Sequence, residues 1–176
     1  SCIELTLPFE AAVVATAHKE DSSTPMRSSL PSRFCTELGT PAAAIACVSP
    51  GRSWDAPHEA ALGILVQGMV DLGLLAGSRD GLIESGAYKR FYMHRTGHWL
   101  GMDVHDVGDY KLGDAWRVFE PGMVTTVEPG LSIAAGTPGV AKKGWNIGIR
   151  IEDDVLVTRR GHEITTGGVP KTVADI

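Results

Sequence analysis

The sequence has few cysteines, and no two of them stand at a metal-binding spacing. Cys2, Cys35 and Cys47 are odd in number and widely separated along the 176 residues. Neither a disulfide framework nor a thiolate zinc site is therefore indicated. Since such cysteines do not require an oxidising compartment, we expect a cytoplasmic location.

The chain also lacks a long apolar run and a strong charge of either sign. The apolar stretch 8–16 contains Glu10, is too short to cross a bilayer and has no basic lead, so we expect neither a membrane segment nor a signal peptide. The 16 basic and 21 acidic residues give a formal net charge of −5. This balance gives no reason to expect nucleic acid as a partner, whereas a small uncharged or zwitterionic substrate is compatible with it.

What the chain does have is a concentration of metal-binding and proton-transferring residues. The segment 91–110, FYMHRTGHWLGMDVHDVGDY, contains His94, His98 and His105. Downstream, Glu128 and Glu152 each lie in an apolar run typical of a strand, where an ionised side chain is costly unless a cation or hydrogen bonds hold it. One histidine and two buried carboxylates suit a hard divalent metal, so the sequence predicts a metal site.

An alternative zinc site must be weighed, because His94 and His98 also have the i, i+4 spacing of a helical HxxxH site. That pattern requires a glutamate directly after the first histidine to act as base, and here the position is Arg95. Gly97 also weakens a helix. We therefore prefer His98 as a ligand. The remaining alternative for His98 is a core histidine with one backbone hydrogen bond.

Four segments carry a family resemblance: SWDAPHEAAL, GHWLGMDVHDVG, TTVEPGLSI and GIRIEDDVLVT. They resemble segments of the Xaa-Pro aminopeptidases (aminopeptidase P), which are pita-bread metallopeptidases like prolidase and methionine aminopeptidase. The similarity runs from about Arg52 to about Thr165. It implies an α+β fold, namely a partial pita-bread (creatinase/aminopeptidase) fold with a curved antiparallel sheet, helices on its outer face and the site in its concavity.

The resemblance also implies a ligand set, of which part is missing. Relatives hold two metal ions with two aspartates, a histidine and two glutamates, and the last three fall on His98, Glu128 and Glu152. The two aspartates would lie upstream, about ten residues apart. The only aspartate between residues 1 and 50 is Asp21, and His18 has no context that matches the further substrate-binding histidine of relatives.

Other roles follow from the resemblance. His105 would be catalytic and substrate-binding, because the family histidine hydrogen-bonds the peptide and stabilises charge on its carbonyl oxygen. The alternative for His105 is a surface pair with Asp106. His94 would lie near the substrate. Arg150 would be a catalytic residue paired with the acidic cluster, or else a solvated strand residue. Ser132 stands where many relatives have tyrosine.

The implied activity is hydrolytic removal of an N-terminal residue that precedes proline, with peptides carrying proline at the second position as substrates. Two divalent ions, usually manganese, would share a hydroxide that attacks the carbonyl. We expect this chain to be the C-terminal part of such a catalytic domain, weak or inactive because the aspartates are not found and one ion or none would bind. The alternative is a noncatalytic pita-bread module that binds a peptide or protein partner.

The predicted organisation has two parts. Residues 1–32 form an atypical N-terminal segment, loop or disorder in part, because 20–32 is rich in serine and proline; residues 33–176 form the partial catalytic domain. Strands missing upstream would leave a sheet edge bare, so self-association into a homo-oligomer is expected. The patterns predict helices over 42–48, from Asp55 to Gly73 or Gly77, and over 82–87. They also predict strands over 123–127, 147–151 and 155–158, with a hairpin turn at Asp153-Asp154. We expect His58 and His162 at the surface, and Trp99 and Trp116 in packing roles.

Overall fold

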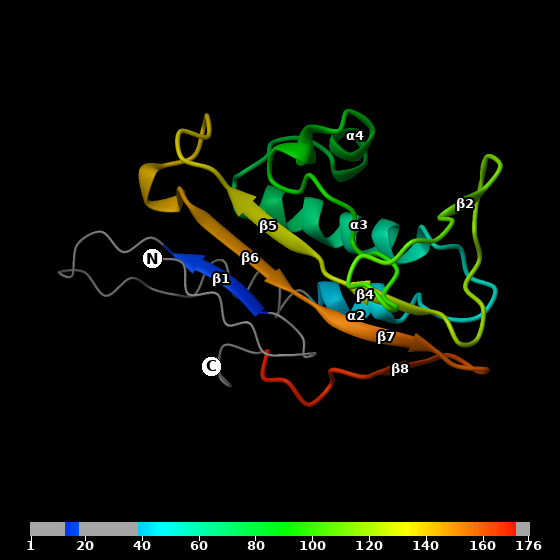
Figure 1. Ribbon diagram of the computed structural model, residues 1–176. Coiled ribbons are helices and arrows are strands. Elements are labelled where there is room, and N and C mark those ends of the chain that lie inside the picture. Colours follow the sequence, from blue (N-terminus) through cyan, green and yellow to red (C-terminus); the bar gives the residue numbers. More distant parts are fainter. Residues whose placement is uncertain (1–12, 18–38, 172–176) are drawn as a thin grey trace.

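The computed structural model describes residues 13–17 and 39–171, and Figure 1 shows how their elements are arranged. The helices are α2 (Thr40–Ile45), α3 (Ala56–Asp71) and α4 (Arg79–Glu84), with 3-10 turns η1 (Ala87–Arg90) and η2 (Lys142–Gly144). The strands are β1 (Val13–Ala17), β2 (Lys111–Leu112), β3 (Ala115–Trp116), β4 (Val124–Val127), β5 (Gly130–Ile133), β6 (Ile147–Ile151), β7 (Asp153–Val157) and β8 (His162–Ile164). Every strand pair among these elements is antiparallel, which confirms the α+β prediction.

Two long strand runs form the centre of the fold. In one, β4 and β5 are separated by two residues; in the other, β6 and β7 are separated by Glu152 alone. On one side of these gaps Val127 pairs with Asp153. On the other side Gly130 pairs with Arg150, so the same register continues across both gaps. The two runs therefore make one antiparallel ribbon, which crosses Figure 1 diagonally as yellow and orange arrows.

The predicted hairpin turn at Asp153-Asp154 is wrong. Both residues begin β7, which pairs with β4 instead of folding back on β6. Asp153 is buried, and its carboxylate accepts hydrogen bonds from Thr166 Oγ1 at 2.7 Å and from Lys171. Because these two donors come from more than ten residues downstream, they compensate the buried charge in a way that the local pattern cannot indicate.

Strand β6 is paired on both sides. It has β5 along one edge and β1 along the other, with Val13 opposite Ile151 and Ala17 opposite Ile147. The expectation of a bare sheet edge is therefore not met at β6, and the homo-oligomer that we inferred from it stays a prediction. β1 falls within the segment 1–32, and the rest of that segment, including Asp21 and His18, lies outside the described residues.

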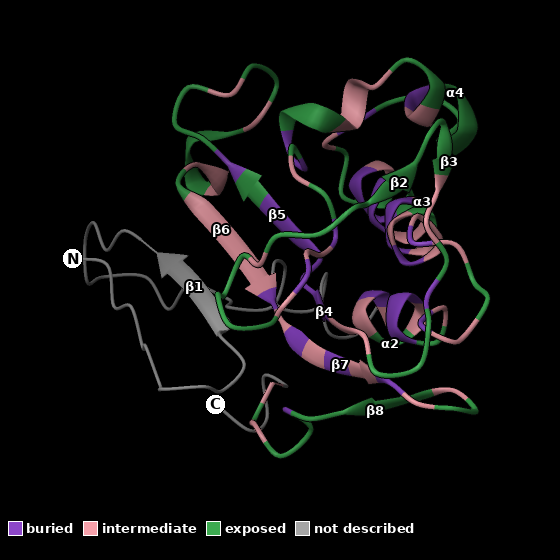
Figure 2. Ribbon diagram, turned by 45° about the vertical axis from the view of Figure 1, so that its right-hand side comes forward, coloured by how far each residue is buried: buried purple, intermediate pink, exposed green. Residues whose placement is uncertain are grey.

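The long helix α3 confirms the prediction from helical spacing. It ends at Asp71, and Gly73 follows with a φ of 70° that glycine adopts easily. Its apolar side packs on β5, β6 and the segment around η1, and Figure 2 shows buried residues on α3 and β5, with β6 mostly of intermediate burial. This first core contains Leu62, Leu65, Val66, Met69, Leu75, Leu82, Phe91, Tyr92, Leu131, Ile133 and Ile151.

The helix starts differ in detail from their predictions. Asp55 precedes α3, but its side chain does not cap the helix; it forms an ion pair with Arg95 instead. α2 begins at Thr40 with Pro41 in its first turn, where the missing N–H costs nothing, and ends at Ile45 instead of continuing to residue 48. α4 begins three residues before the predicted helix, because the Ser78 side chain accepts a hydrogen bond from Gly81 N at 3.3 Å.

A second core lies between α2 and the β4–β7 pair. The ring centroids of Trp54 and Trp99 are 3.9 Å apart, and Phe119 packs against both. Trp99 is buried and Trp116 lies at the edge of this core, so the prediction that both residues serve packing is confirmed. This core anchors the segment that leads into His98.

Candidate metal centre

Three predicted ligands lie together where the central ribbon is interrupted. His98, Glu128 and Glu152 each present one nitrogen or oxygen atom, and these atoms lie within 4.8 Å of one another. Glu128 is buried, and the other two residues are partly buried. A neutral imidazole with two carboxylates is a suitable donor set for a divalent cation.

The ribbon places the two carboxylates face to face. Because the register of β4 with β7 continues into that of β5 with β6, Glu128 lies opposite Glu152. Like charges opposite each other on paired strands destabilise a sheet unless something compensates them. Burial, followed by the charges of Glu128 and Asp154, raises the pKa of Glu152 to about 7. The pair thus requires a proton or a cation, and the residues fit a metal ion.

His98 is held by backbone pairing with β4. Thr126 N donates to His98 O at 3.0 Å, and His98 N donates to Thr126 Oγ1 at 3.0 Å. This close approach requires glycine at position 97, since a Cβ there would lie 2.0 Å from Thr126 O. The extended pairing excludes a helical HxxxH site.

The orientation of the His98 ring leaves one nitrogen free for a metal. Nδ1 lies 2.9 Å from the carbonyl oxygen of Trp99, and because a carbonyl oxygen only accepts, Nδ1 carries the proton. In the neutral ring Nε2 then presents its lone pair, 3.4 Å from Glu128 Oε1. A backbone bond that fixes the tautomer in this way is typical of metal-binding histidines.

Arg150 and the two remaining histidines surround these ligands. Arg150 Nη1 lies 3.1 Å from Glu128 Oε2, so Arg150 pairs with the acidic cluster. The His105 ring is exposed, and its centroid is 4.2 Å from that of His98. His94 is partly buried, and its Nδ1 donates to the Arg95 carbonyl at 2.7 Å. Burial is the main cause that lowers the pKa of His94.

The loop that carries His105 is fixed by its neighbour. Asp106 does not pair with His105; its carboxylate accepts hydrogen bonds from Met102 N at 3.1 Å and Val107 N at 2.8 Å. A Cβ on Gly101 would lie 1.8 Å from the same carboxylate, so this tight loop also needs glycine. The loop therefore presents His105 toward His98 without a contact to Asp106.

Some residues near the centre were missed or misplaced by the sequence patterns. His58 is not at the surface: it is partly buried, its Nδ1 lies 2.9 Å from Thr96 Oγ1, and burial lowers its pKa. Burial is the main cause that raises the pKa of Asp154, and His98 lies close enough to lower that pKa in part. His162 is exposed as predicted, although its Nδ1 also donates to Val48 O at 2.9 Å. If Asp154 had been predicted as a strand residue, its side chain would have been expected on the same face as that of Glu152. The adjacent Asp153 led us to predict a turn there instead.

The two upstream aspartates that the family resemblance implies have no counterpart on β1, which pairs with β6. β1 pairs with β6 along its whole length, and its sequence VVATA contains no acidic residue. Asp21 lies outside the described residues. In the described part of the chain, the metal-ligating group consists of three residues.

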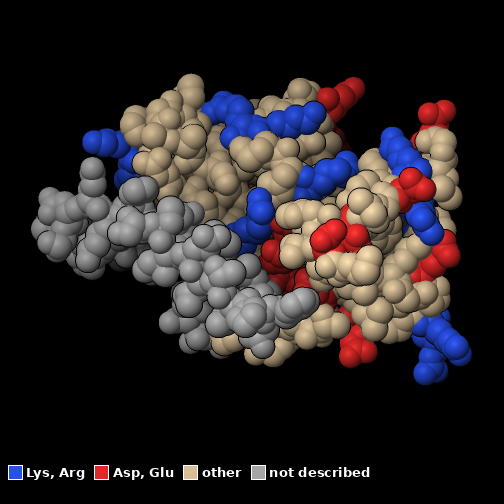
Figure 3. Space-filling view, viewed as in Figure 1, with Lys and Arg blue, Asp and Glu red and all other residues tan. Residues whose placement is uncertain are grey.

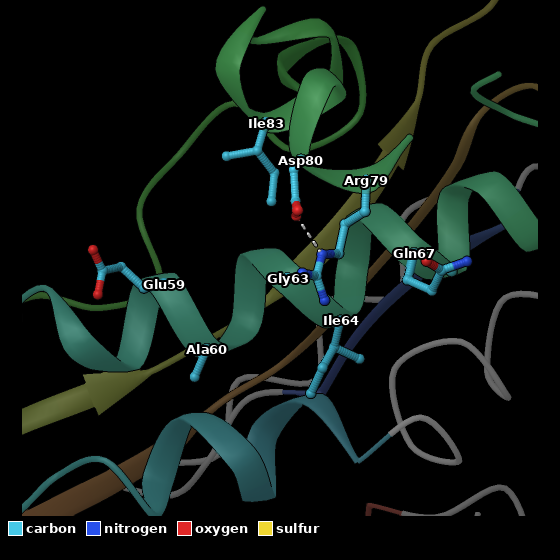
Figure 4. Close-up of a pocket in the computed structure, with 9 residues that line it drawn as sticks. Glu59, Ala60, Gly63, Ile64, Gln67, Arg79, Asp80 and Ile83 are labelled. Atoms are coloured by element: carbon cyan, nitrogen blue, oxygen red, sulfur yellow. Dashed lines mark hydrogen bonds and ion pairs between the residues drawn. The ribbon is translucent and has the colours of Figure 1, made fainter. Parts of the chain in front are cut away.

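A separate groove lies between α3 and α4 and has about 550 Å³ of space. Figure 4 shows Ile64 and Ile83 beside an ion pair between Arg79 and Asp80, whose Nε and Oδ1 atoms are 2.8 Å apart. The groove contains neither histidine nor any of the three ligands. It is therefore not the place where the chemistry of the chain is concentrated.

The surface and the helices bear on possible partners. Figure 3 shows acidic atoms gathered near the centre of one face, with basic side chains beside and above them. On this face the mixed distribution does not resemble the basic stripe of a nucleic-acid-binding protein. Among residues 13–17 and 39–171, no helix is both long and apolar enough to cross a membrane.

Comparison with known proteins identifies the origin of this arrangement. Residues 39–159 match the model of metallopeptidase family M24. The chain is 50% identical over 133 residues to Xaa-Pro aminopeptidase of Haemophilus influenzae, covering 76% of this chain and 30% of the relative. It is 50% identical over 113 residues to Xaa-Pro aminopeptidase of Escherichia coli, covering 64% of this chain and 25% of the relative. The chain thus spans less than a third of the length of these curated relatives.

The solved structures agree with this assignment. Pseudomonas aeruginosa aminopeptidase PepP superposes with a TM-score of 0.78 at 56% identity, covering 82% of this chain and 33% of that one. Proline aminopeptidase P II from Yersinia pestis gives a TM-score of 0.75 at 44% identity, with 82% and 33% covered. The expectation of a partial pita-bread fold is confirmed. Because the family model matches residues 39–159, more than half of the chain, the chain belongs to metallopeptidase family M24.

Proposed function

We propose that the chain is part of a metal-dependent aminopeptidase that releases an N-terminal residue preceding proline. The single observation that carries this proposal is the placement of Glu128 opposite Glu152, with Nε2 of His98 beside them. Two carboxylates in such proximity are stable when a cation lies between them. The names of the relatives supply the substrate class.

In this proposal His98, Glu128 and Glu152 hold a divalent ion, and manganese is the ion that we expect. When bound, a divalent ion supplies Lewis acidity and lowers the pKa of a water molecule. Arg150 neutralises one oxygen of Glu128 and so keeps the other available as a ligand. We also propose a cytoplasmic location from the cysteine pattern, and a catalytic domain over residues 33–176 behind an atypical segment over 1–32.

The remaining histidines bind substrate in this proposal. His105, exposed and adjacent to His98, donates a hydrogen bond to the peptide carbonyl and stabilises the charge that develops there. His94, on the same segment, lies along the path of the peptide. The substrate is a peptide with proline at its second position, and neither nucleic acid nor membrane is a partner.

A second candidate function is a noncatalytic module that binds a peptide through the same surface. The observation that favours it is the acid-free sequence of β1 beside β6, because no carboxylate there can hold a second ion. One loosely held ion does not fix both the nucleophile and the substrate amine, and a displacement of about 1 Å costs on the order of a hundredfold in rate. We therefore expect the chain to hydrolyse Xaa-Pro peptides slowly or not at all.

Two measurements on the 176-residue chain test these proposals. The first is metal content by mass spectrometry on protein prepared without chelator and loaded with manganese. About one ion per chain supports the metal centre, and no ion overturns it. The second is hydrolysis of a Xaa-Pro dipeptide in excess manganese. A rate within about tenfold of a full-length relative would refute the expected weakness and mean that further ligands exist.

A further inference from the structure

Thr96 connects helix α3 to the metal centre through both its side chain and its backbone. Its Oγ1 lies 2.5 Å from Tyr92 Oη and 2.9 Å from His58 Nδ1. Its carbonyl oxygen accepts the N–H of Glu128 at 2.6 Å. Thr96 is 2% exposed and Tyr92 is 1% exposed, so water does not compete for these bonds. A single residue thus receives two side-chain contacts and holds the backbone of a proposed ligand.

The side-chain contacts matter because the segment around Thr96 has no regular structure of its own. Residues 92–98 belong to no helix and no strand, and Gly97 follows Thr96 directly. Glycine leaves the adjoining peptide units more freedom than any other residue. Two hydrogen bonds to Oγ1 restrict that freedom from the other side and thereby set the direction of the Thr96 carbonyl.

The partners of Thr96 are themselves fixed. His58 lies in the first turn of α3, and its ring stacks on that of Tyr92 with centroids 5.8 Å apart. Arg95 forms an ion pair with Asp55 at the start of the same helix. Consecutive residues of the segment are therefore attached to one end of α3, which is anchored in the first core.

We propose that Thr96, supported by His58 and Tyr92, is a positioning residue that fixes the backbone of Glu128 and, through Gly97, the approach of His98 to β4. A hydroxyl can donate one hydrogen bond and accept others, so it can satisfy both partners, whereas a methyl group satisfies neither. The proposal deepens the proposed metal-binding function and rests on it for the role of Glu128. Its mechanical part concerns the chain without metal and can be tested alone.

The test compares amide hydrogen exchange at Glu128 in metal-free protein by NMR. We expect Thr96→Val to speed exchange of the Glu128 amide about tenfold relative to the amide of Val157, which bonds Met123 at the far end of β4. Thr96→Ser, which keeps the hydroxyl, should restore the wild-type ratio. Thr40→Val is the matched control, because Thr40 is equally buried but its Oγ1 has no hydrogen-bond partner.

Each outcome of this comparison decides the proposal. An unchanged ratio in Thr96→Val, or an equal acceleration in Thr40→Val, overturns it. If Thr96→Val does not fold, Tyr92→Phe removes one of the two contacts and keeps the ring; acceleration confined to the Glu128 amide supports the proposal, and none overturns it. A loss of folding in Thr40→Val as well would assign the effect to burial alone and would also overturn it.

Manganese affinity, measured by calorimetry on the same variants, separates this proposal from the proposed function. We expect Thr96→Val to weaken binding about tenfold and Thr96→Ser and Thr40→Val to leave it unchanged. If the wild-type chain binds no manganese, the metal-centre proposal fails while the exchange ratio still decides whether Thr96 positions Glu128. If manganese binds equally to wild type and Thr96→Val, the metal centre stands and Thr96 has no effect on metal binding, while the exchange ratio still decides whether it positions the Glu128 backbone.

Discussion

Arg150 Nη1 lies 3.1 Å from Glu128 Oε2, which is the carboxylate oxygen that does not face His98. The other oxygen, Oε1, lies 3.4 Å from His98 Nε2 and accepts a hydrogen bond from Thr126 Oγ1 at 3.2 Å. The carboxylate of Glu128 therefore has one oxygen neutralised by a protein cation and one directed toward the proposed metal. Of the two roles considered for Arg150, the ion pair is the one that the structure has; its catalytic role stays a prediction.

Replacing Arg150 with Ala should destabilise the metal-free chain more than the manganese-loaded chain. Without the guanidinium, two opposed carboxylates remain without a positive partner until a cation binds. Because 41% of the Arg150 side chain is exposed, solvent screens the pair, and we expect a loss of about 1 kcal/mol in the free energy of unfolding. Thermal unfolding with and without manganese measures this difference, and an equal loss in both conditions would contradict it.

Replacing Glu152 with Gln should abolish manganese binding. The amide keeps the size of the side chain but removes the charge that a hard cation requires. Calorimetry with manganese measures the loss, and Glu163→Gln, a change at an exposed residue of β8, serves as the control. Affinity that is unchanged in the Glu152 variant would remove Glu152 from the ligand set.

The metal-free chain should become less stable as the pH rises from about 4.5 to about 7. Burial raises the pKa of Glu152 from 4.5 to about 7, so the folded state holds a proton that the unfolded chain releases at lower pH. The stabilisation is complete below pH 4.5 and is lost as the pH rises through 7. Urea unfolding of chelator-treated protein across this range, compared with Glu152→Gln, tests the assignment. A slope that persists in the variant would assign it to other groups.

Replacing Gly97 with Ala should destabilise the chain by about 2 to 3 kcal/mol, because the new Cβ would lie 2.0 Å from Thr126 O and force the segment away from β4. Gly63→Ala is the matched control: it lies in α3, where a Cβ meets nothing within 4 Å, and should stabilise by about 0.5 to 1 kcal/mol. Chemical denaturation of both variants gives the comparison. Equal stability of the two variants would mean that the close approach does not matter.

Replacing His98 and replacing His105 should have opposite effects on manganese binding. We expect His98→Ala to lose manganese, because Nε2 of His98 is the proposed metal-binding nitrogen. We expect His105→Ala to keep manganese, because His105 is proposed to contact the substrate and not the metal. Metal analysis of both variants after dialysis distinguishes the roles. Loss of the metal in His105→Ala would make that residue a ligand.

Strands β4 and β6, most of β7 and the clustering of His98, Glu128 and Glu152 could be predicted from the sequence, whereas β1, β2, β3, β5 and β8 were not predicted. Glu128 and Glu152 lie beside apolar, β-branched residues typical of strands, and an ionised group in such a position demands compensation. The repeated apolar spacing of α3 was equally clear, because one face of that helix is almost entirely buried. These features depend on local pattern, which the sequence contains directly.

The features that were missed depend on partners distant in sequence. Asp153 is a strand residue because Thr166 and Lys171 compensate it from the C-terminal segment. His58 is partly buried because Thr96, 38 residues away, binds its ring. No local pattern contains these contacts, so a turn and a surface histidine were the natural expectations at those positions.

The uninterrupted register of the central ribbon makes the position of Glu152 unusually sensitive to chain length. The residues before Glu152 are held by the pairing of β6 with β5, and the residues after it by the pairing of β7 with β4, so both pairings must keep the same register. Inserting or deleting one residue between Ile147 and Asp153 would turn the later side chains of β7 to the opposite face, exposing Val155 and directing Asp154 into the core. Evolution can therefore vary the identity of residues along this run far more readily than their number.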